Sequence, residues 1–326
     1  MKIISGTPRL IAGLVLAGAT MTVAAQSDFP VKSILFMVPQ AAGGSTDTLA
    51  RTIGQKLSDA MGLPVVSENR AGANGIIGTE WVAKAVPNGA TLLVGGTGTM
   101  AINPSLYAKI TYDPVKQFAA VANFGYSTSV LVVHPSLAPK TIGELIALAK
   151  SRPGDLKYAS AGVGSSPHLS AEMFKQMAGV DLLHVPYKGS TPGVSATLTG
   201  ETDMMFTGVA SAVGIIKAGR LRPLSINGPK RSPALPGVPT AGESGLPGFE
   251  ADFWIGLFAP AGTPRPVINR INAEVNKIIT AETMKERFAA IGVDPLPGTP
   301  EQFGELLVKD IERWSRAVKS AGLKAE

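Results

Sequence analysis

Two segments of the chain place glycines and hydroxyl side chains directly ahead of predicted helices, an arrangement that suits anion binding. The first runs from Gln40 to Asp47 and the second from Ser160 to His168. Glycine adopts backbone angles that other residues resist, and Ser, Thr or Asp caps a helix N-terminus. Because backbone N–H groups point outward at such a terminus, each segment can hold a carboxylate or phosphate oxygen. Taken alone, the first segment is better explained as a tight strand-to-helix turn without a ligand.

Other chemistries have less support. The histidines His134, His168 and His184 are not at metal-ligand spacing and the chain has no cysteine, so no metal site is expected. We expect His168 to be a structural hydrogen-bond partner or a ligand contact, not a catalytic base. There is no G-x-S-x-G motif, and Lys188–Thr191 has the residues of a Walker loop in the wrong order. The dinucleotide-like match at Gly96–Ala101 lacks a ribose-binding acidic residue, so no cofactor is expected.

Buried strands and amphipathic helices must position the two segments. The apolar run Ile34–Val38 predicts a strand covered on both faces, followed by an amphipathic helix with its apolar face from Leu49 to Leu57. Leu156–Ala159 predicts the strand before the second segment, with Ser166 as the helix cap and Pro167 at the first helical position. This alternation predicts an α/β fold that binds ligands beyond the carboxyl ends of its strands.

Later segments predict the N-termini of two further helices and a passage of the chain between two lobes. Thr141 followed by Glu144 predicts a capping box, and Thr299–Gln302 is expected to cap the last helix. The Pro- and Gly-rich run Gly228–Pro247 predicts a crossing between two lobes. The helices after it are expected to pack back on the first lobe.

The N-terminus is typical of an export signal. Lys2 and Arg9 accompany the short apolar run Leu10–Ala19, and Ala25 fits a cleavage site, so residues 1–25 are predicted to be a signal peptide. A membrane anchor fits less well because a span needs about 18 apolar residues. Removal of the signal leaves 28 basic against 24 acidic residues, a scattered net charge of +4 that does not indicate nucleic-acid binding. With no cysteine for a disulfide or a lipid, the sequence predicts a free periplasmic protein. We also expect it to be a monomer.

Six motifs in order along the mature chain resemble those of the Bug family, the periplasmic solute-binding receptors of tripartite tricarboxylate transporters. The motifs are Val38-Pro39 with Gly43-Gly44 and Asp47, Glu68-Asn69-Arg70 with Gly72-Ala73 and Gly75, Pro87-Asn88-Gly89, Tyr158–Gly162 with Gly164-Ser165 and His168-Leu169, Val185–Gly189, and Ala259–Pro264. One departure is Asn88-Gly89-Ala90, where the family commonly has Asp-Gly-Tyr. It concerns a loop before a strand and leaves the predicted binding site unaffected.

The resemblance implies a two-lobed α/β, type II periplasmic-binding-protein (Venus flytrap) fold, each lobe being a mostly parallel sheet flanked by helices. Residues 26–125 and 227–326 would form lobe 1 and residues 126–226 lobe 2, with hinges near 124–129 and 226–228. The cleft would close on a small organic acid, which a membrane permease would then accept. Such a receptor has no catalytic residue, cofactor or metal.

The resemblance also implies a set of binding residues. From the first loop it gives Gln40, Ala41, Ala42, Ser45 and Asp47, and from the second Ser160, Gly164, Ser165 and His168. Thr97 and Thr99 would line the first-lobe side, while Phe206, Thr207 and Trp254 are expected to face the pocket and select the ligand. Asp47, itself anionic, is expected to orient the loop and a water. Neither loop contains Lys or Arg, so backbone N–H groups would hold the anion.

Two alternatives remain open from the sequence. A protein with the same fold could sense a solute and signal to a membrane partner. An exported enzyme could use the same cleft, but it would need an acid/base or nucleophile constellation that the sequence does not offer.

Overall fold

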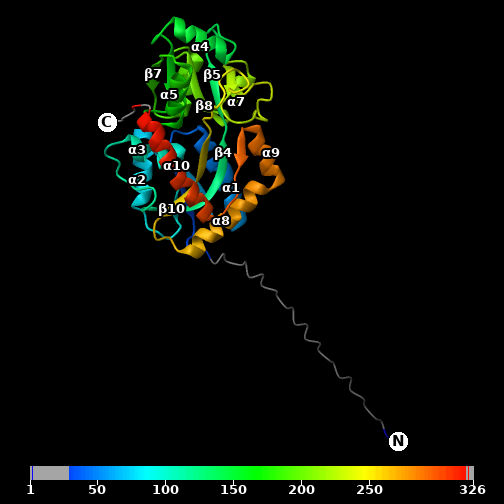
Figure 1. The fold of residues 1–326 in the computed structure, drawn as a ribbon. Helices are drawn as coiled ribbons and strands as arrows, with labels where there is room; N and C mark the ends of the chain where they lie inside the picture. Colours follow the sequence, from blue (N-terminus) through cyan, green and yellow to red (C-terminus); the bar gives the residue numbers. More distant parts are fainter. Residues whose placement is uncertain (1, 3–28, 321, 323–326) are drawn as a thin grey trace.

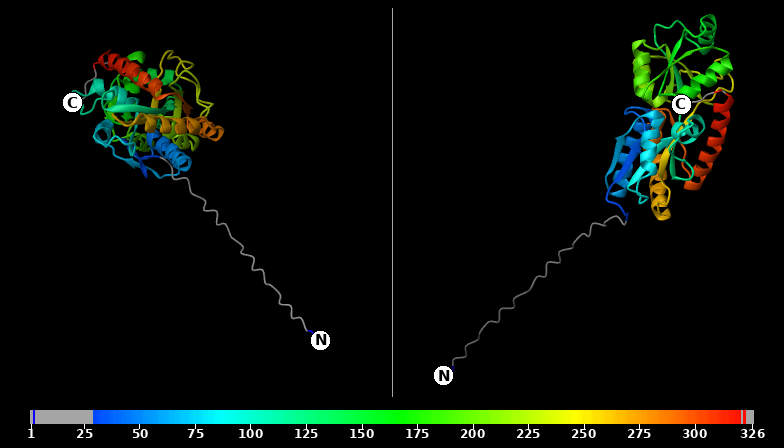
Figure 2. Two further views of the ribbon diagram at one scale, coloured as in Figure 1. Left: turned by 90° about the horizontal axis from the view of Figure 1, so that it is seen from below. Right: turned by 90° about the vertical axis from the view of Figure 1, so that its left-hand side faces the viewer.

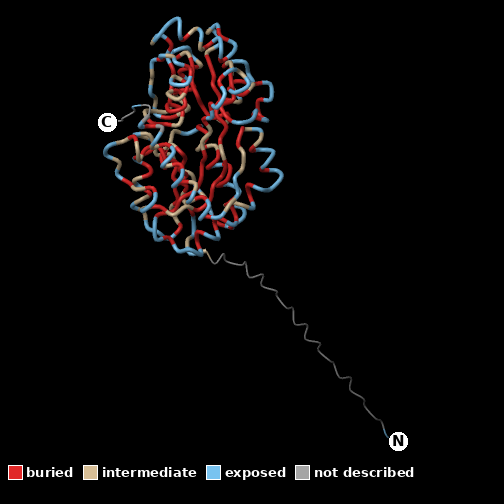
Figure 3. Tube along the Cα trace, viewed as in Figure 1, coloured by how far each residue is buried: buried red, intermediate tan, exposed pale blue. Residues whose placement is uncertain are grey.

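The computed structural model describes residues 2, 29–320 and 322. The predicted signal peptide, except for Lys2, lies outside the described residues. Figure 1 shows two lobes stacked along the long axis of the molecule, and the second view in Figure 2 shows the same division from the side. Figure 3 shows that buried residues fill the interior of each lobe. The predicted two-lobed α/β fold is confirmed.

The first lobe is built on a six-stranded sheet in the order β11-β4-β10-β3-β1-β2. Its strands are β1 (Ile34–Val38), β2 (Val65–Asn69), β3 (Thr91–Gly96), β4 (Phe118–Ser127), β10 (Phe253–Pro260) and β11 (Val293–Pro295). Its helical segments are α1 (Ser45–Met61), η1 (Ala73–Gly75), α2 (Ile76–Ala83), η2 (Gly98–Ile102), α3 (Asn103–Leu106), α8 (Arg265–Thr280), α9 (Glu282–Ala290) and α10 (Pro300–Ser320).

The second lobe is built on a five-stranded sheet in the order β7-β6-β8-β5-β9. Its strands are β5 (Ser129–Val133), β6 (Lys157–Ser160), β7 (Leu183–Pro186), β8 (Met204–Gly208) and β9 (Arg222–Ile226). Its helices are α4 (Ile142–Ser151), α5 (Ser166–Ala178), α6 (Ser190–Thr199) and α7 (Val209–Lys217).

Strand directions correct the expectation that each sheet is mostly parallel. In the first lobe β1 is parallel to β2 and β3, whereas β10 is antiparallel to β3 and β4, and β11 is antiparallel to β4. In the second lobe β6 is parallel to β7 and β8, whereas β5 is antiparallel to β8 and β9. The strands β5 and β10 each carry the chain from the crossing into a lobe, so they run away from the cleft. The strands beside them run in the opposite direction and end at the cleft. Both sheets are therefore mixed.

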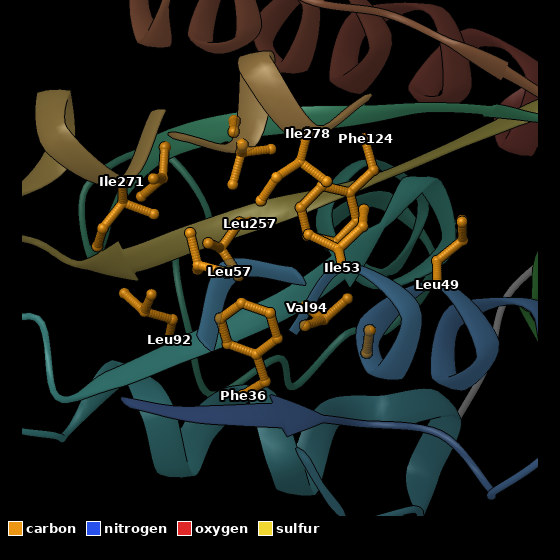
Figure 4. Packing of buried hydrophobic residues seen from close by; sticks show 14 of the residues in the cluster. Phe36, Leu49, Ile53, Leu57, Leu92, Val94, Phe124, Leu257, Ile271 and Ile278 are labelled. Carbon is orange, nitrogen blue, oxygen red and sulfur yellow. The ribbon is translucent and has the colours of Figure 1, made fainter. Parts of the chain in front are cut away.

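Two apolar clusters cover the two faces of the first sheet. On one face, α1, α8 and α9 pack against the strands, and Figure 4 shows Phe36 close to Leu57 and Ile53 of α1, with Leu49 farther along the same helix. On the other face lie side chains of α2, η2, α3 and α10, including Trp314. The predicted face of α1 and the return of the C-terminal helices to this lobe are confirmed. Burial of such side chains contributes about 1.5–3 kcal/mol each.

Residues 228–251 pack on the second lobe, and this corrects the expected lobe boundary at residue 227. Leu246, Phe249 and Ala251 belong to the apolar cluster of the second lobe, together with Tyr158 and Phe206. The predicted Pro- and Gly-rich crossing therefore covers the second lobe, because its few apolar side chains find their burial there. The chain passes between lobes at Thr128 and again at Asp252, whose carboxylate accepts a 3.1 Å hydrogen bond from the Ser129 N–H.

Among the described residues, no helix combines the length and apolar character that a membrane crossing requires.

Candidate ligand-binding site

A small cavity lies between the lobes, beyond the carboxyl ends of β1, β3 and β6. Its volume is about 60 Å³, several times the minimum that holds one water. We call it the inner cavity. Its lining residues are Gln40, Ala41, Gly44, Ser45, Thr46, Asn74, Gly96, Thr97, Gly98, Ala161, Ser165, Ser166, Pro167, Ser190, Phe253, Trp254 and Ile255.

The N-termini of three helices converge on the inner cavity. Ser45 begins α1, Ser166 begins α5 and Ser190 begins α6. The first backbone bonds of α1 and α5 are donated by Thr48 and Leu169, at 2.9 and 3.0 Å, so the N–H groups before them have no acceptor within the helix. Each terminus carries roughly half a positive charge from the helix dipole. The cavity therefore presents several N–H donors and a positive potential.

This positive potential comes from the backbone. Of the described residues that line the inner cavity, none carries a charged side chain. Hydrogen bonds from neutral N–H groups to a carboxylate are worth about 1.5–3 kcal/mol each. A few such bonds supply much of the roughly 8 kcal/mol that micromolar binding requires.

Asp47 holds the first loop in shape from behind the cavity. Its carboxylate accepts hydrogen bonds from the Gly43 N–H at 2.9 Å and the Asn69 amide at 3.0 Å, and it pairs with Arg51 at 3.0 Å. The same Asn69 amide also donates to the carbonyl of Gln40 at 3.1 Å. Burial acts to raise the pKa of Asp47, but the hydrogen bonds from Arg51, Gly43 and Asn69 outweigh it and hold the pKa below its usual value. Asp47 is thus an ionised anchor for the loop and does not line the cavity.

The second loop is fixed by its own cap. The helix cap is Ser165, one residue earlier than the predicted Ser166, and its hydroxyl accepts the His168 N–H at 3.4 Å. Gly164 has φ +80°, and a Cβ there would lie 1.9 Å from a methyl of Leu106 in the first lobe. A side chain at Gly164 would therefore force Leu106 to shift, and its positive φ would strain any residue other than glycine.

His168 supports this loop from within the second lobe. Its Nδ1 accepts the Gly164 N–H at 3.0 Å, and its ring stacks on His184 with centroids 4.1 Å apart. His184 in turn stacks on Tyr158, while its Nε2 lies 2.6 Å from Ser160 Oγ. Burial lowers the pKa of both histidines to about 4. Both rings are therefore neutral at pH 7, and neither lines the cavity.

Three hydrogen bonds join the lobes around the cavity. Thr191 Oγ1 donates to the Ala42 carbonyl at 2.8 Å, and Ser45 Oγ lies 3.0 Å from Ser211 Oγ. The Tyr107 hydroxyl donates to the Val163 carbonyl at 2.7 Å. Leu169 of the second lobe also packs into the apolar cluster that contains Leu106 of the first. The structure thus shows the lobes in contact around the cavity.

The structure places about half of the predicted binding residues at the inner cavity. Those that line it are Gln40, Ala41, Ser45, Thr97, Ser165 and Trp254. Those that support it from behind are Ala42, Asp47, Thr99, Ser160, Gly164 and His168. Thr97 has a second task, since its hydroxyl accepts the Trp254 N–H at 3.0 Å.

Phe206 and Thr207 were expected to face the pocket, and the structure corrects this. Both are fully buried in β8, and neither lines the cavity. Phe206 packs on Phe174 and Phe249 in the core of the second lobe. All five residues of β8 are buried. The strand therefore has no cleft-facing side chain at these positions.

Sequence reasoning did not identify Asn74, Ser166 and Ser190 as lining residues. Asn74 adopts φ +48° in a loop whose sequence is rich in residues that accept such angles. Ser190 follows β7 directly after the motif Val185–Gly189 and begins α6. The sequence does contain a signal for Ser190, because Gly189, Ser190 and Thr191 repeat for a third time the pattern of glycine and hydroxyl residues at the start of a helix.

A larger, open compartment adjoins the inner cavity. It has a volume of about 580 Å³, and we call it the outer compartment. It is lined by Pro39, Gln40, Ala71, Gly72, Ala73, Asn74, Gly75, Tyr107, Ala161, Gly162, Val163, Pro186, Tyr187, Lys188 and Gly189. Within the described part of the chain, no group of three or more His, Asp or Glu residues is arranged to hold a metal ion.

Comparison with known proteins gives consistent similarities. The sequence model of the tripartite tricarboxylate transporter family receptors matches residues 49–323. A protein of Pseudomonas sp. (strain P51), the "UPF0065 protein in tcbD-tcbE intergenic region", is 41% identical over 98% of this chain and 96% of its own. The "Protein BugT" of Bordetella pertussis is 36% identical over 97% of this chain and 98% of its own.

Solved structures with a similar fold include three with substantial sequence identity. "R. palustris Rpa4515 with adipate" has a TM-score of 0.89 and 34% identity, covering 91% of this chain and 99% of that one. "Periplasmic binding protein BugD" has a TM-score of 0.87 and 31% identity, covering 91% and 100%. MatC from Rhodopseudomonas palustris "with bound malate" has a TM-score of 0.84 and 34% identity, covering 89% and 100%.

Proposed function

This chain belongs to the family of tripartite tricarboxylate transporter receptors, and on that basis we propose that it captures a small carboxylate in the inner cavity and delivers it to a membrane permease. The family and its solved neighbours are periplasmic solute-binding proteins. We place this receptor in the periplasm after removal of residues 1–25, and we propose that it acts as a monomer without catalytic activity.

The observation that carries the proposal is the convergence of three helix N-termini on a cavity without charged side chains. Such a cavity attracts an anion and gives it several hydrogen-bond donors. A cation gains nothing from these dipoles. The adipate and malate bound by two similar proteins are carboxylates that suit this chemistry.

The proposed ligand contacts follow from the geometry. The N–H groups of Ser45, Thr46 and Ser166 would bind one carboxylate, with Gln40 and Ser190 beside them. Asp47 would hold the first loop and orient a water, and His168 would hold the second loop. The anion would be bound without a salt bridge.

Binding would be coupled to closure of the lobes. An open form would take the acid on the first-lobe loop, and the N-termini of α5 and α6 would then complete the site. The hinges would lie where the chain passes between the lobes: at Thr128, within the expected segment 124–129, and at Asp252, in place of the expected segment 226–228. Interlobe bonds such as Thr191 to Ala42 would form on closure and favour the bound state.

Signalling to a membrane partner remains the alternative use of the same binding event. A permease would have to accept the closed form, whereas a sensor would only have to recognise it. Transport of a labelled acid by cells with and without this protein separates the two roles.

Thermal unfolding tests the binding step. The mature protein would be stripped of ligand by unfolding and refolding and then heated with a panel of small acids, neutral solutes and amines. A ligand at about 100 times its dissociation constant adds roughly 2.7 kcal/mol of stability, a midpoint shift of a few degrees. A saturable shift with one or a few related acids is expected. Shifts with neutral or cationic solutes alone would overturn the proposal.

A further inference from the structure

A turn shared by the inner cavity and the outer compartment has an unusual backbone. Asn74 lines both spaces, and it has φ +48°, directly after Ala73 with φ +44°. Among the described residues these are the two non-glycine residues with positive φ. A side chain in this left-handed region is unfavourable, and it persists where the surrounding structure holds it. The surroundings of Asn74 should therefore contain the group that holds this turn.

Asn103 is that group. Its side-chain amide donates to the carbonyl of Asn74 at 3.1 Å, and its Oδ1 accepts a hydrogen bond from the Asn74 side-chain amide at 2.7 Å. Asn103 is fully buried and lines neither the inner cavity nor the outer compartment. A carboxamide is needed here, because a carboxylate offers no donor at neutral pH and an apolar side chain offers neither donor nor acceptor. Asn103 thus binds both the backbone and the side chain of Asn74.

Tyr112 completes the network on the other side of Asn103. The Asn103 amide also donates to the Tyr112 hydroxyl at 3.2 Å, and that hydroxyl donates to the carbonyl of Thr99. The segment η2 is a short π-helix, in which the N–H of Asn103 bonds to the carbonyl of Gly98. The next carbonyl, that of Thr99, would take the N–H of residue 104, but Pro104 has none. Tyr112 therefore supplies the missing donor.

The network joins two segments that line the inner cavity. Asn74 lies in η1 and Gly98 begins η2, and both residues line the cavity. The two segments are also in direct contact, since a Cβ at Gly75 would lie 2.5 Å from a methyl of Thr99. The Asn74 amide nitrogen in turn lies 3.4 Å from the position of a Cβ on Gly164 in the second loop. The orientation of Asn74 thus affects both the cavity and the contact between the lobes.

We propose that Asn103 is a positioning residue for ligand binding, and that together with Tyr112 it holds Asn74 and the η1 turn in the binding geometry before the ligand arrives. The inference rests on the proposed carboxylate-binding function and adds to it the residue that preorganises one wall of the site. A turn that is held in advance loses less freedom when the ligand binds. Loss of the network therefore lowers the affinity, although Asn103 touches no ligand.

A double-mutant cycle tests this role. Asn103→Leu removes the network at nearly constant side-chain size, and Asn74→Gly keeps the left-handed backbone without strain. Isothermal titration of the ligand-stripped protein would use adipate, malate and the acid with the largest thermal shift. Asn103→Leu is expected to weaken binding about three- to thirtyfold. In the Asn74→Gly background the same change should weaken binding by a factor at least about threefold smaller, because glycine needs no support there.

Two further variants separate positioning from stability. Asn272→Leu is the matched control, because Asn272 is also buried and its amide donates to the carbonyls of Val121 and Gly298 at 2.8 and 2.9 Å, away from the residues that line the site. This change should lower the unfolding midpoint and leave the affinity unchanged. Tyr112→Phe removes one hydroxyl and should weaken binding about two- to fivefold. If Asn103→Leu does not fold, Tyr112→Phe takes its place in the cycle.

The outcomes distinguish this inference from the proposed function. Equal affinities of Asn103→Leu and the wild type, or effects of Asn103→Leu and Asn74→Gly that add, overturn the inference and leave the carboxylate receptor in place. A comparable loss of affinity in Asn272→Leu would show that binding follows stability alone, which also overturns the inference. Failure of every acid to bind overturns both.

Discussion

The Oγ1 atom of Thr191 donates a 2.8 Å hydrogen bond to the carbonyl oxygen of Ala42, which joins the second lobe to the first beside the inner cavity. The bond can exist only while the lobes are together. Its partner loop is the one whose N–H groups are proposed to bind the carboxylate. In the proposed mechanism, lobe closure and ligand capture would therefore be linked through one short segment of backbone.

Thr191→Val removes this hydrogen bond while keeping the shape of the side chain. Because a net hydrogen bond contributes about 0.5–1.5 kcal/mol, the affinity for the acid should fall about two- to tenfold. Thr199→Val is the matched control, since the Thr199 hydroxyl bonds only to carbonyls of its own helix. Equal affinities for the wild type and Thr191→Val in isothermal titration would remove this bond from the closure mechanism.

Asp47→Asn tests whether Asp47 anchors the loop or opposes the ligand. The change removes the ion pair with Arg51 and one acceptor site, so we expect about 1–3 kcal/mol lower stability and weaker acid binding. Because the folded pKa of Asp47 is lowered, its contribution is present above about pH 4 and is lost as pH falls through the folded pKa. The stability difference between wild type and variant should therefore shrink in acid. Tighter acid binding by Asp47→Asn would mean that Asp47 repels the ligand.

Asp252, at the second passage between lobes, is expected to destabilise the fold at neutral pH. Burial raises the pKa of Asp252 to about 7, aided by Asp294 and Glu250, while the Ser129 N–H and Lys230 act to lower it. The contribution of this carboxyl is therefore favourable below about pH 4 and is lost as pH rises to about 7.

Asp252→Asn keeps an acceptor for the Ser129 N–H and removes the charge. The free energy of unfolding of Asp252→Asn, relative to that of the wild type, should increase by an amount on the order of a few kcal/mol between pH 4 and 7. Above pH 7 the difference should stay constant. Denaturant unfolding at several pH values measures this. A pH-independent effect of Asp252→Asn would contradict the account of this site.

The stacked histidines predict acid sensitivity of the second loop. Both folded pKa values are about 4, so the stability they contribute is present above about pH 6.5 and is lost as pH falls toward 4. Lys175 adds to the lowering and Glu172 opposes it. His184→Gln should lower the stability at pH 7, because it breaks the stack. Between pH 6.5 and 4.5 the stability of this variant should fall less than that of the wild type. Parallel pH profiles for His184→Gln and the wild type would contradict this role.

Local signals let several features be predicted from the sequence. Thr141 and Glu144 form the predicted capping box, with the Glu144 N–H donating to Thr141 Oγ1 at 3.2 Å. The Gln302 N–H donates to Thr299 Oγ1 in the same way. The apolar face of α1 also follows from spacing alone. These features depend on residues a few positions apart, so the sequence contains the whole interaction.

Other features depend on tertiary contacts and could not be predicted in this way. Phe206 lies in a strand buried on both faces, where no alternation marks the side that faces the cleft. Ser190 joins the cavity only because the lobes meet. The directions of β5 and β10 follow from the path of the chain between lobes, which the order of elements does not reveal.

The central claim is that backbone N–H groups at the helix N-termini bind a carboxylate, and a competing charge tests it most directly. Ser166→Asp places an anion inside the cavity, while an acidic residue in the first turn favours the helix dipole and should preserve the fold. Ser195→Asp, at an exposed position on α6, is the control. Using the acid with the largest thermal shift, isothermal titration should show at least about 100-fold weaker binding to Ser166→Asp and unchanged binding to Ser195→Asp. Wild-type affinity in a folded Ser166→Asp protein would contradict the account.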